Sequence, residues 1–115
     1  MKTISILKDF SRTPGPRYKI QGNNSGEQFR EQILTNAVRE AIATQTVLLV
    51  DLDGTSGYTT SFLEESFGGL IRIEKIRYQD VINHVKIKSD EDNEYLDEIS
   101  EYLDDAKNED VSVAA

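Results

Sequence analysis

The chain has 115 residues, no cysteine and a formal net charge of −8 at pH 7, and it has no apolar run near the roughly 20 residues that a membrane-spanning helix needs. This length fits one domain with a single core, and the lack of cysteine excludes disulfides, thiol nucleophiles and cysteine-based metal sites. The first ten residues lack the apolar stretch of a signal peptide, so we expect a cytoplasmic protein with no membrane partner.

The charge is unevenly distributed along the chain. Residues 89–115 carry eleven of the 21 acidic side chains but one of the 13 basic ones, so the preceding part is nearly neutral. Because nonspecific nucleic-acid binding depends on basic groups that neutralise phosphates, we expect no nucleic-acid partner. A basic protein partner remains compatible with this charge.

The N-terminal segment predicts a β-hairpin with a wide loop. Thr3–Leu7 alternates like a short edge strand, and Tyr18–Gln21 is expected to form a second strand. Between them, Pro14–Pro16 excludes regular structure. Arg12 and Arg17 flank this turn and are candidates for binding an anion.

Two amphipathic helices and one apolar strand follow. Ser25–Ala43 has an apolar stripe at helical spacing, and Ser25 with Gln28 fits a capping box. Thr46–Leu52 has no alternation, which predicts a central strand buried on both faces. Ser61–Ile71 has the spacing of a second helix.

The C-terminal part is less regular. Ile71–Ile76 is a candidate short strand, Tyr78–Asn83 a candidate helical turn, and Val85–Lys88 a further strand. Asp90–Ala106 predicts a last helix with one narrow apolar stripe and an acidic opposite face. The remaining residues, 107–115, are expected to be a disordered acidic tail.

This order of elements predicts an α/β fold. We expect a mixed sheet of four to five strands with helices packed on it, in a single domain over residues 1–106.

The segment at the end of the central strand carries acidic residues that indicate one kind of chemistry. The string from Leu48 to Thr55, LLVDLDGT, resembles the first motif of haloacid-dehalogenase-like phosphatases. The resemblance implies Asp51 as nucleophile and Asp53 as general acid/base, with magnesium between them and a phosphate. The rest of that family's catalytic set is not recognisable in the sequence. In the alternative interpretation, the two aspartates cap and shape a turn.

The same segment also resembles the central part of STAS domains, the fold of bacterial anti-sigma factor antagonists. More closely, the chain resembles a small bacterial STAS-like family of uncharacterised function. The residues that carry this resemblance are Pro14-Gly15-Pro16-Arg17, Ser25-Gly26-Glu27-Gln28-Phe29-Arg30, Asp51-Leu52-Asp53-Gly54, Gly57-Tyr58 and Ser61-Phe62-Leu63-Glu64-Glu65-Ser66-Phe67-Gly68-Gly69-Leu70. The resemblance extends over roughly residues 12–88 and implies a STAS-like fold.

The resemblance also implies a function. It favours a non-enzymatic regulatory module that binds another protein through the loop 54–61 and the start of the following helix, with no cofactor and no metal. Aligned with the STAS motif, Ser61 takes the place of the phosphorylated serine, and the implied partner is a histidine-kinase-like ATPase. The sequence departs from that motif at Thr59, Thr60 and Phe62.

Alternatives remain open at this loop. Ser61 with Glu64 also fits a capping box, although Thr59 or Thr60 would serve equally as the cap. Tyr58 is a candidate interface residue if it is exposed, and a core residue if it folds back. A small-ligand or nucleotide sensor at the same loop is a third functional alternative.

Overall fold

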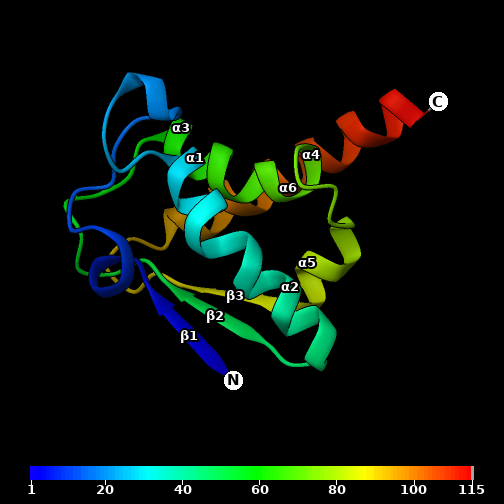
Figure 1. Ribbon diagram of the computed structural model, residues 1–115, viewed down its shortest axis with the longest axis horizontal. Coiled ribbons are helices and arrows are strands. Elements are labelled where there is room, and N and C mark those ends of the chain that lie inside the picture. Colours follow the sequence, from blue (N-terminus) through cyan, green and yellow to red (C-terminus); the bar gives the residue numbers. More distant parts are fainter. Residues whose placement is uncertain (115) are drawn as a thin grey trace.

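The computed structural model describes the backbone of residues 1–114 and the side chains of residues 1–109. The described residues form one sheet of three parallel strands in the order β1 (Lys2–Ser5), β2 (Leu48–Asp51) and β3 (Val85–Lys88). Helices between consecutive strands return the chain to the same end of the sheet (Figure 1), which makes every pairing parallel. The α/β class is therefore confirmed, whereas the predicted mixed sheet of four to five strands is wrong.

The predicted N-terminal hairpin is replaced by a tight turn. Lys19–Gln21 forms a 3-10 turn, and the segment does not pair with β1. The N–H of Tyr18 donates to Gln21 Oε1 at 2.9 Å, and the N–H of Lys19 donates to Glu27 Oε1 at 2.9 Å. Because side chains satisfy these donors, the segment needs no neighbouring strand.

The first predicted helix is confirmed. It consists of α1 (Gly26–Phe29) and α2 (Thr35–Thr44), joined without a break by the π-helical turn Arg30–Leu34. Ser25 Oγ accepts a hydrogen bond from Gln28 N at 3.0 Å, and the Gln28 side chain accepts one from Asn24 N at 3.2 Å. The cap thus satisfies two donors at the helix start.

The second predicted helix is also confirmed and is one residue longer at each end. We call residues 60–72 the central helix, which comprises α3 (Thr60–Leu63), the π-helical turn Glu64–Gly68 and α4 (Gly69–Arg72). After it, the N–H groups of residues 73 and 74 donate back to Gly69 O, which ends the helix in a turn. The short strand predicted for Ile71–Ile76 is therefore wrong.

The C-terminal helices differ from the prediction at their boundaries. A short helix α5 (Tyr78–His84) precedes β3, and α6 spans Glu94–Ala114. The helix predicted for Asp90–Ala106 thus starts four residues later, because the N–H groups of residues 90 and 91 donate to the side chain of Asp53. The domain boundary at 106 and the disorder of 107–115 remain predictions; Ala115 lies outside the described residues.

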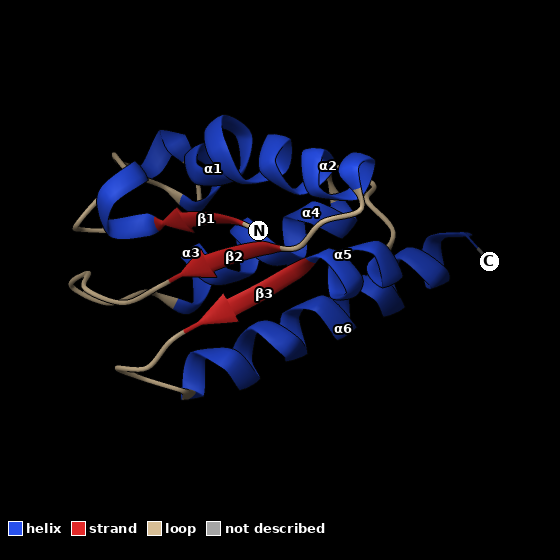
Figure 2. Ribbon diagram, turned by 90° about the horizontal axis from the view of Figure 1, so that it is seen from below, coloured by secondary structure: helices blue, strands red, loops and turns tan. Residues whose placement is uncertain are grey.

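The helices cover one face of the sheet. In β2, Leu48 and Val50 are fully buried, whereas Leu49 and Asp51 are partly exposed. Figure 2 shows the other face of the three strands, with the helices behind and beside them. The prediction of burial on both faces is therefore wrong, and the core lies between the sheet and the central helix.

No helix in the described part of the chain combines the length and apolar character required to cross a bilayer.

Candidate functional site

Asp51 and Asp53 lie at the carboxyl end of β2 and accept hydrogen bonds that shape the turn. Asp51 Oδ1 accepts from Asp53 N at 2.9 Å. Asp53 Oδ2 accepts from Lys88 Nζ at 2.7 Å and from Asp90 N at 3.1 Å, and its Oδ1 accepts from Glu91 N at 3.0 Å. The side chain of Asp53 thus joins the end of β2 to the turn that follows β3.

These contacts favour the ionised form of Asp53. The N–H of Glu91 and the ammonium of Lys88 hold the pKa of Asp53 below its ordinary value, and Asp53 in turn raises the pKa of Lys88. A general acid needs the opposite change, a pKa raised toward neutrality. A lysine does lie beside the two aspartates, as the phosphatase chemistry requires, but it binds the residue that would have to donate the proton. Among the described residues, no group of three or more His, Cys, Asp or Glu side chains is arranged to hold a metal ion.

The first half of the loop after β2 packs against its surroundings. Gly54 has φ +94, and a Cβ there would lie 2.6 Å from the Leu7 side chain, so the turn needs a glycine. Its N–H donates to Glu91 Oε1 at 2.7 Å, and Ser56 N donates to Arg12 O at 2.9 Å. The backbone of Arg12, one of the two predicted anion-binding residues, thus holds the loop, while its side chain is exposed.

Tyr58 folds back toward the core. Its hydroxyl donates to Leu52 O at 2.7 Å, and its ring meets the Tyr95 ring edge-on with 5.3 Å between centroids. Burial raises the pKa of Tyr58 above its ordinary value. The side chain therefore braces the loop, and its hydroxyl is already hydrogen-bonded.

The central helix begins at an exposed corner, and Thr59 is its cap. Thr59 Oγ1 accepts from Phe62 N at 3.0 Å, and Thr60 is the first helical residue. Ser61 consequently lies in the first turn, and its hydroxyl makes no hydrogen bond within the described part of the chain. The capping interpretation of Ser61 is wrong, because Thr59 supplies the cap two residues earlier.

Ser61 faces a shallow pocket that it shares with the second predicted anion-binding residue, Arg17. The pocket has a volume of about 360 Å³, and its lining is formed by Pro16, Arg17, Tyr18, Gln21, Thr59 and Ser61. Two predicted site residues more than 40 positions apart in sequence are thus brought together.

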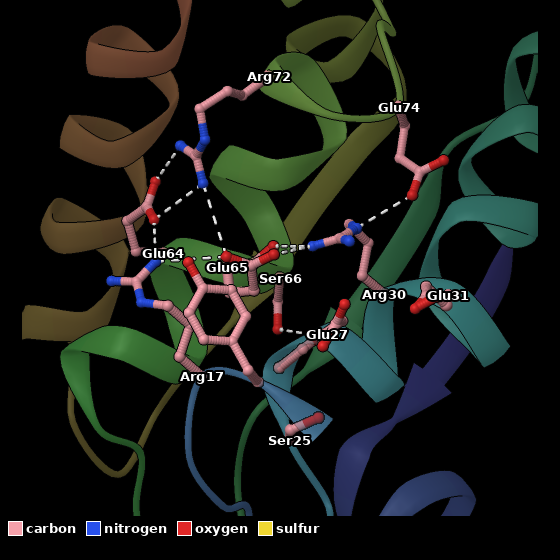
Figure 3. A network of polar contacts seen from close by, with 12 residues as sticks. Arg17, Ser25, Glu27, Arg30, Glu31, Glu64, Glu65, Ser66, Arg72 and Glu74 are labelled. Atoms are coloured by element: carbon pink, nitrogen blue, oxygen red, sulfur yellow. Dashed lines mark hydrogen bonds and ion pairs between the residues drawn. The ribbon is translucent and has the colours of Figure 1, made fainter. Parts of the chain in front are cut away.

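Behind this pocket, Arg17 enters a network of charged side chains that is drawn in Figure 3. Its Nη1 donates to Glu64 and, at 3.4 Å, to Glu65. Arg72 also binds Glu64, with a second bond from Nη2 to Glu64 Oε1 at 3.0 Å. Burial opposes ionisation of Glu64, but the hydrogen bonds and charges of Arg72 and Arg17 outweigh it and lower the pKa of Glu64.

The inner part of the network is almost completely buried. Arg30 and Glu65 have side chains that are 3% and 2% exposed, and Arg30 Nη1 donates to Glu65 Oε2 at 2.5 Å and to Glu65 O at 2.8 Å. Arg30 Nε donates to Glu74 Oε2 at 3.0 Å. Removing either member of this pair would break the main ionic contact of a buried charge, so the pair fixes how the first helix packs on the central helix.

Small residues permit this close approach. A Cβ on Gly26 would lie 2.5 Å from Phe62 O, and a Cβ on Gly69 would lie 2.6 Å from Arg30 Nη1. Ser66 Oγ donates to Gly26 O at 3.4 Å across the same contact. Gly69 therefore makes room for a guanidinium group, whereas Gly26 makes room for the backbone of the central helix.

The comparison of the sequence with family models identifies a known family. Residues 25–94 match the model described as a STAS-like domain of unknown function (DUF4325). The chain belongs to this STAS-like family. No curated protein and no solved structure shows significant similarity to the chain.

Four charged residues of the network come from the motifs that carry the resemblance to the STAS-like family. Arg17, Arg30, Glu64 and Glu65 all belong to those motifs, and the structure joins them. The sequence does not reveal their roles, because a charged side chain in an amphipathic helix normally faces the solvent. A signal was present, since Glu65 lies three residues after Phe62 on the apolar face of its helix.

Proposed function

We propose that this STAS-like chain is a non-enzymatic regulatory module that binds another protein at the start of the central helix and is switched by phosphorylation of Ser61. The observation that carries the proposal is the position of Ser61: its hydroxyl has no capping role and lines a pocket with Arg17. A hydroxyl that the fold does not use is available to a modifying enzyme.

The surroundings of Ser61 favour a phosphate there. Dipoles and free N–H groups at a helix start stabilise negative charge, and Arg17 adds a guanidinium that suits phosphate oxygens. Glu64 and Glu65 would oppose a phosphate if they were unpaired. Their pairing with arginines reduces that repulsion.

An exposed apolar side chain lies beside the same pocket and supports a role in protein binding. Ile20 is 94% exposed and Tyr18 is 44% exposed, both in or next to the 3-10 turn Lys19–Gln21. Hydrogen bonds from Tyr18 N and Lys19 N to side chains fix this turn. A rigid turn presents an apolar anchor at a small entropic cost, as interface hot spots require. We call Pro16–Gln21 together with Thr59–Ser61 the corner surface.

The modifying partner in this proposal is a histidine-kinase-like ATPase, as the family resemblance implies. Adding a charge of about −1.5 to −2 at Ser61 would then change the affinity of the corner surface for its binding partner.

The experiment is affinity capture from the native host with wild-type, Ser61→Ala and Ser61→Asp baits, combined with intact-mass measurement of phosphate on each bait. Ser100→Ala and Ser100→Asp are matched controls, because Ser100 is an exposed serine on α6. We expect phosphate on the wild type but not on Ser61→Ala, and a partner whose recovery differs between the two Ser61 baits. Equal recovery with both Ser61 baits and no phosphate on the wild type would reject the proposal.

A further inference from the structure

We propose that Arg17 is the group that detects the modification: it binds the carboxylate of Glu64 when Ser61 is free and the phosphate monoester when Ser61 is phosphorylated. This inference rests on the proposed function for its biological setting, but its chemistry concerns a site formed by three side chains of this chain.

The geometry places Ser61 within reach of the same guanidinium. Ser61 precedes Glu64 by three residues and Glu65 by four, so the three side chains lie on one face of the central helix. Arg17 bonds to both glutamates and also lines the pocket with Ser61. Its guanidinium therefore binds residues one helical turn beyond the hydroxyl that would carry the phosphate.

Arg17 also has hydrogen-bonding capacity to spare. Both of its bonds to the glutamates use Nη1, and Nε and Nη2 make no hydrogen bond within the described residues. A phosphate accepts two parallel N–H bonds from a guanidinium, which a single lysine ammonium cannot reproduce. The site can therefore hold a phosphate monoester through two parallel hydrogen bonds.

Moving Arg17 to a phosphate leaves no carboxylate of the network alone. Glu64 keeps two hydrogen bonds from Arg72, and Glu65 keeps its bonds from the buried Arg30. Because a buried unpaired charge is the main cost of breaking such contacts, this exchange avoids that cost. Arg30 would not have this freedom, since it is enclosed on all sides.

The exchange would affect the turn that carries Ile20. Arg17 lies between two carbonyls that hold this turn to the start of α1: Pro16 O accepts from Gly26 N at 2.9 Å, and Arg17 O accepts from Glu27 N at 3.0 Å. A shift of the Arg17 side chain toward Ser61 would strain both of these backbone hydrogen bonds. In this way a charge at Ser61 repositions the other half of the corner surface.

The test uses the full chain, made with phosphoserine installed at position 61, so that no kinase is needed. Titration followed by ³¹P NMR gives the second pKa of the phosphate, ordinarily about 6. We expect Arg17→Gln to raise this pKa by about half a unit or more, because a nearby cation favours the dianion, and Arg17→Lys to raise it less. The same substitutions should leave phosphoserine at position 100 unchanged.

Amide hydrogen exchange measures the movement of the turn. Phosphorylation should speed exchange at Gly26 and Glu27 in the wild type and not in Arg17→Gln. Equal ³¹P titrations in the wild type and in both folded Arg17 variants would overturn the assignment of Arg17. If the ³¹P titration depends on Arg17 but amide hydrogen exchange at Gly26 and Glu27 does not change on phosphorylation, the anion site is established and the proposed movement of the turn is overturned. Either result is independent of whether the host phosphorylates Ser61, so the proposed function stands or falls separately.

Discussion

Two of the places in the described structure where acidic side chains meet basic ones are built differently. At the carboxyl end of the sheet, Asp53 binds Lys88 and two backbone N–H groups of the next turn. Under the central helix, Glu64 and Glu65 bind arginines from the N-terminal turn, from the first helix and from the central helix itself.

This difference separates two uses of charge. Asp53 stabilises one local connection between neighbouring strand ends, which is a structural task. The glutamates couple three segments far apart in sequence, and one of the arginines they hold, Arg17, also borders an unused hydroxyl. In the function that we propose, the functional surface lies at the second cluster, although the acidic motif in the sequence draws attention to the first.

The largest expected effect comes from breaking the buried pair. Glu65→Gln removes one of the two carboxylates that neutralise the buried Arg30, leaving Glu74 as the other, and should lower the free energy of unfolding by about 3 kcal/mol. Arg39→Gln is the control, because Arg39 is at the exposed end of the network and its loss should cost no more than about 0.5 kcal/mol. Urea unfolding measures both, and equal losses would contradict the account.

A smaller effect is expected at the strand end. Asp53→Asn keeps the shape but loses the charge on its bonds to Lys88 and the turn, and should cost about 1 kcal/mol in urea unfolding.

If the aspartates were catalytic instead, Asp51→Asn would abolish a magnesium-dependent hydrolysis of a phosphomonoester by the wild type. We expect the wild type to show no such turnover.

The helix cap gives a matched pair of substitutions two residues apart. Thr59→Ala removes the cap and should cost about 1 kcal/mol, whereas Ser61→Ala should cost less than about 0.5 kcal/mol. Thermal unfolding would show the reverse order if Ser61 capped the helix.

Acid should weaken the network over a defined pH range. The folded state lowers the pKa of Glu64 below 4.5, its ordinary value, so this group stabilises the fold above that pH. The contribution is lost as the pH falls through the lowered pKa. Urea midpoints measured from pH 7 downward should therefore fall less steeply below pH 4.5 in Glu64→Gln than in the wild type, and identical slopes would contradict this assignment.

Sequence reasoning predicted local structure where one stretch decides it. The two long helices, the strand at 85–88 and the start of the first helix at Ser25 depend on nearby residues, and the structure confirms them. The prediction of a strand at Tyr18–Gln21 was wrong. The N–H groups of this segment donate to the side chains of Gln21 and Glu27, and no sequence pattern reveals those acceptors.

The candidate site was predicted in part. Ser61 and Arg17 were each singled out, but their proximity follows from the packing of α1 on the central helix. Arg30 and Glu65 were missed because a charged residue beside an apolar stripe is normally solvated, and their burial depends on mutual neutralisation.

The most direct test of the corner surface compares two exposed isoleucines. Ile20 lies in the corner surface, whereas Ile73 is 48% exposed after the end of the central helix. The partner captured by the wild type should bind Ile20→Asp at least about tenfold more weakly and bind Ile73→Asp as the wild type does. Undiminished binding to Ile20→Asp, with both variants folded, would show that the partner docks elsewhere and would contradict the account.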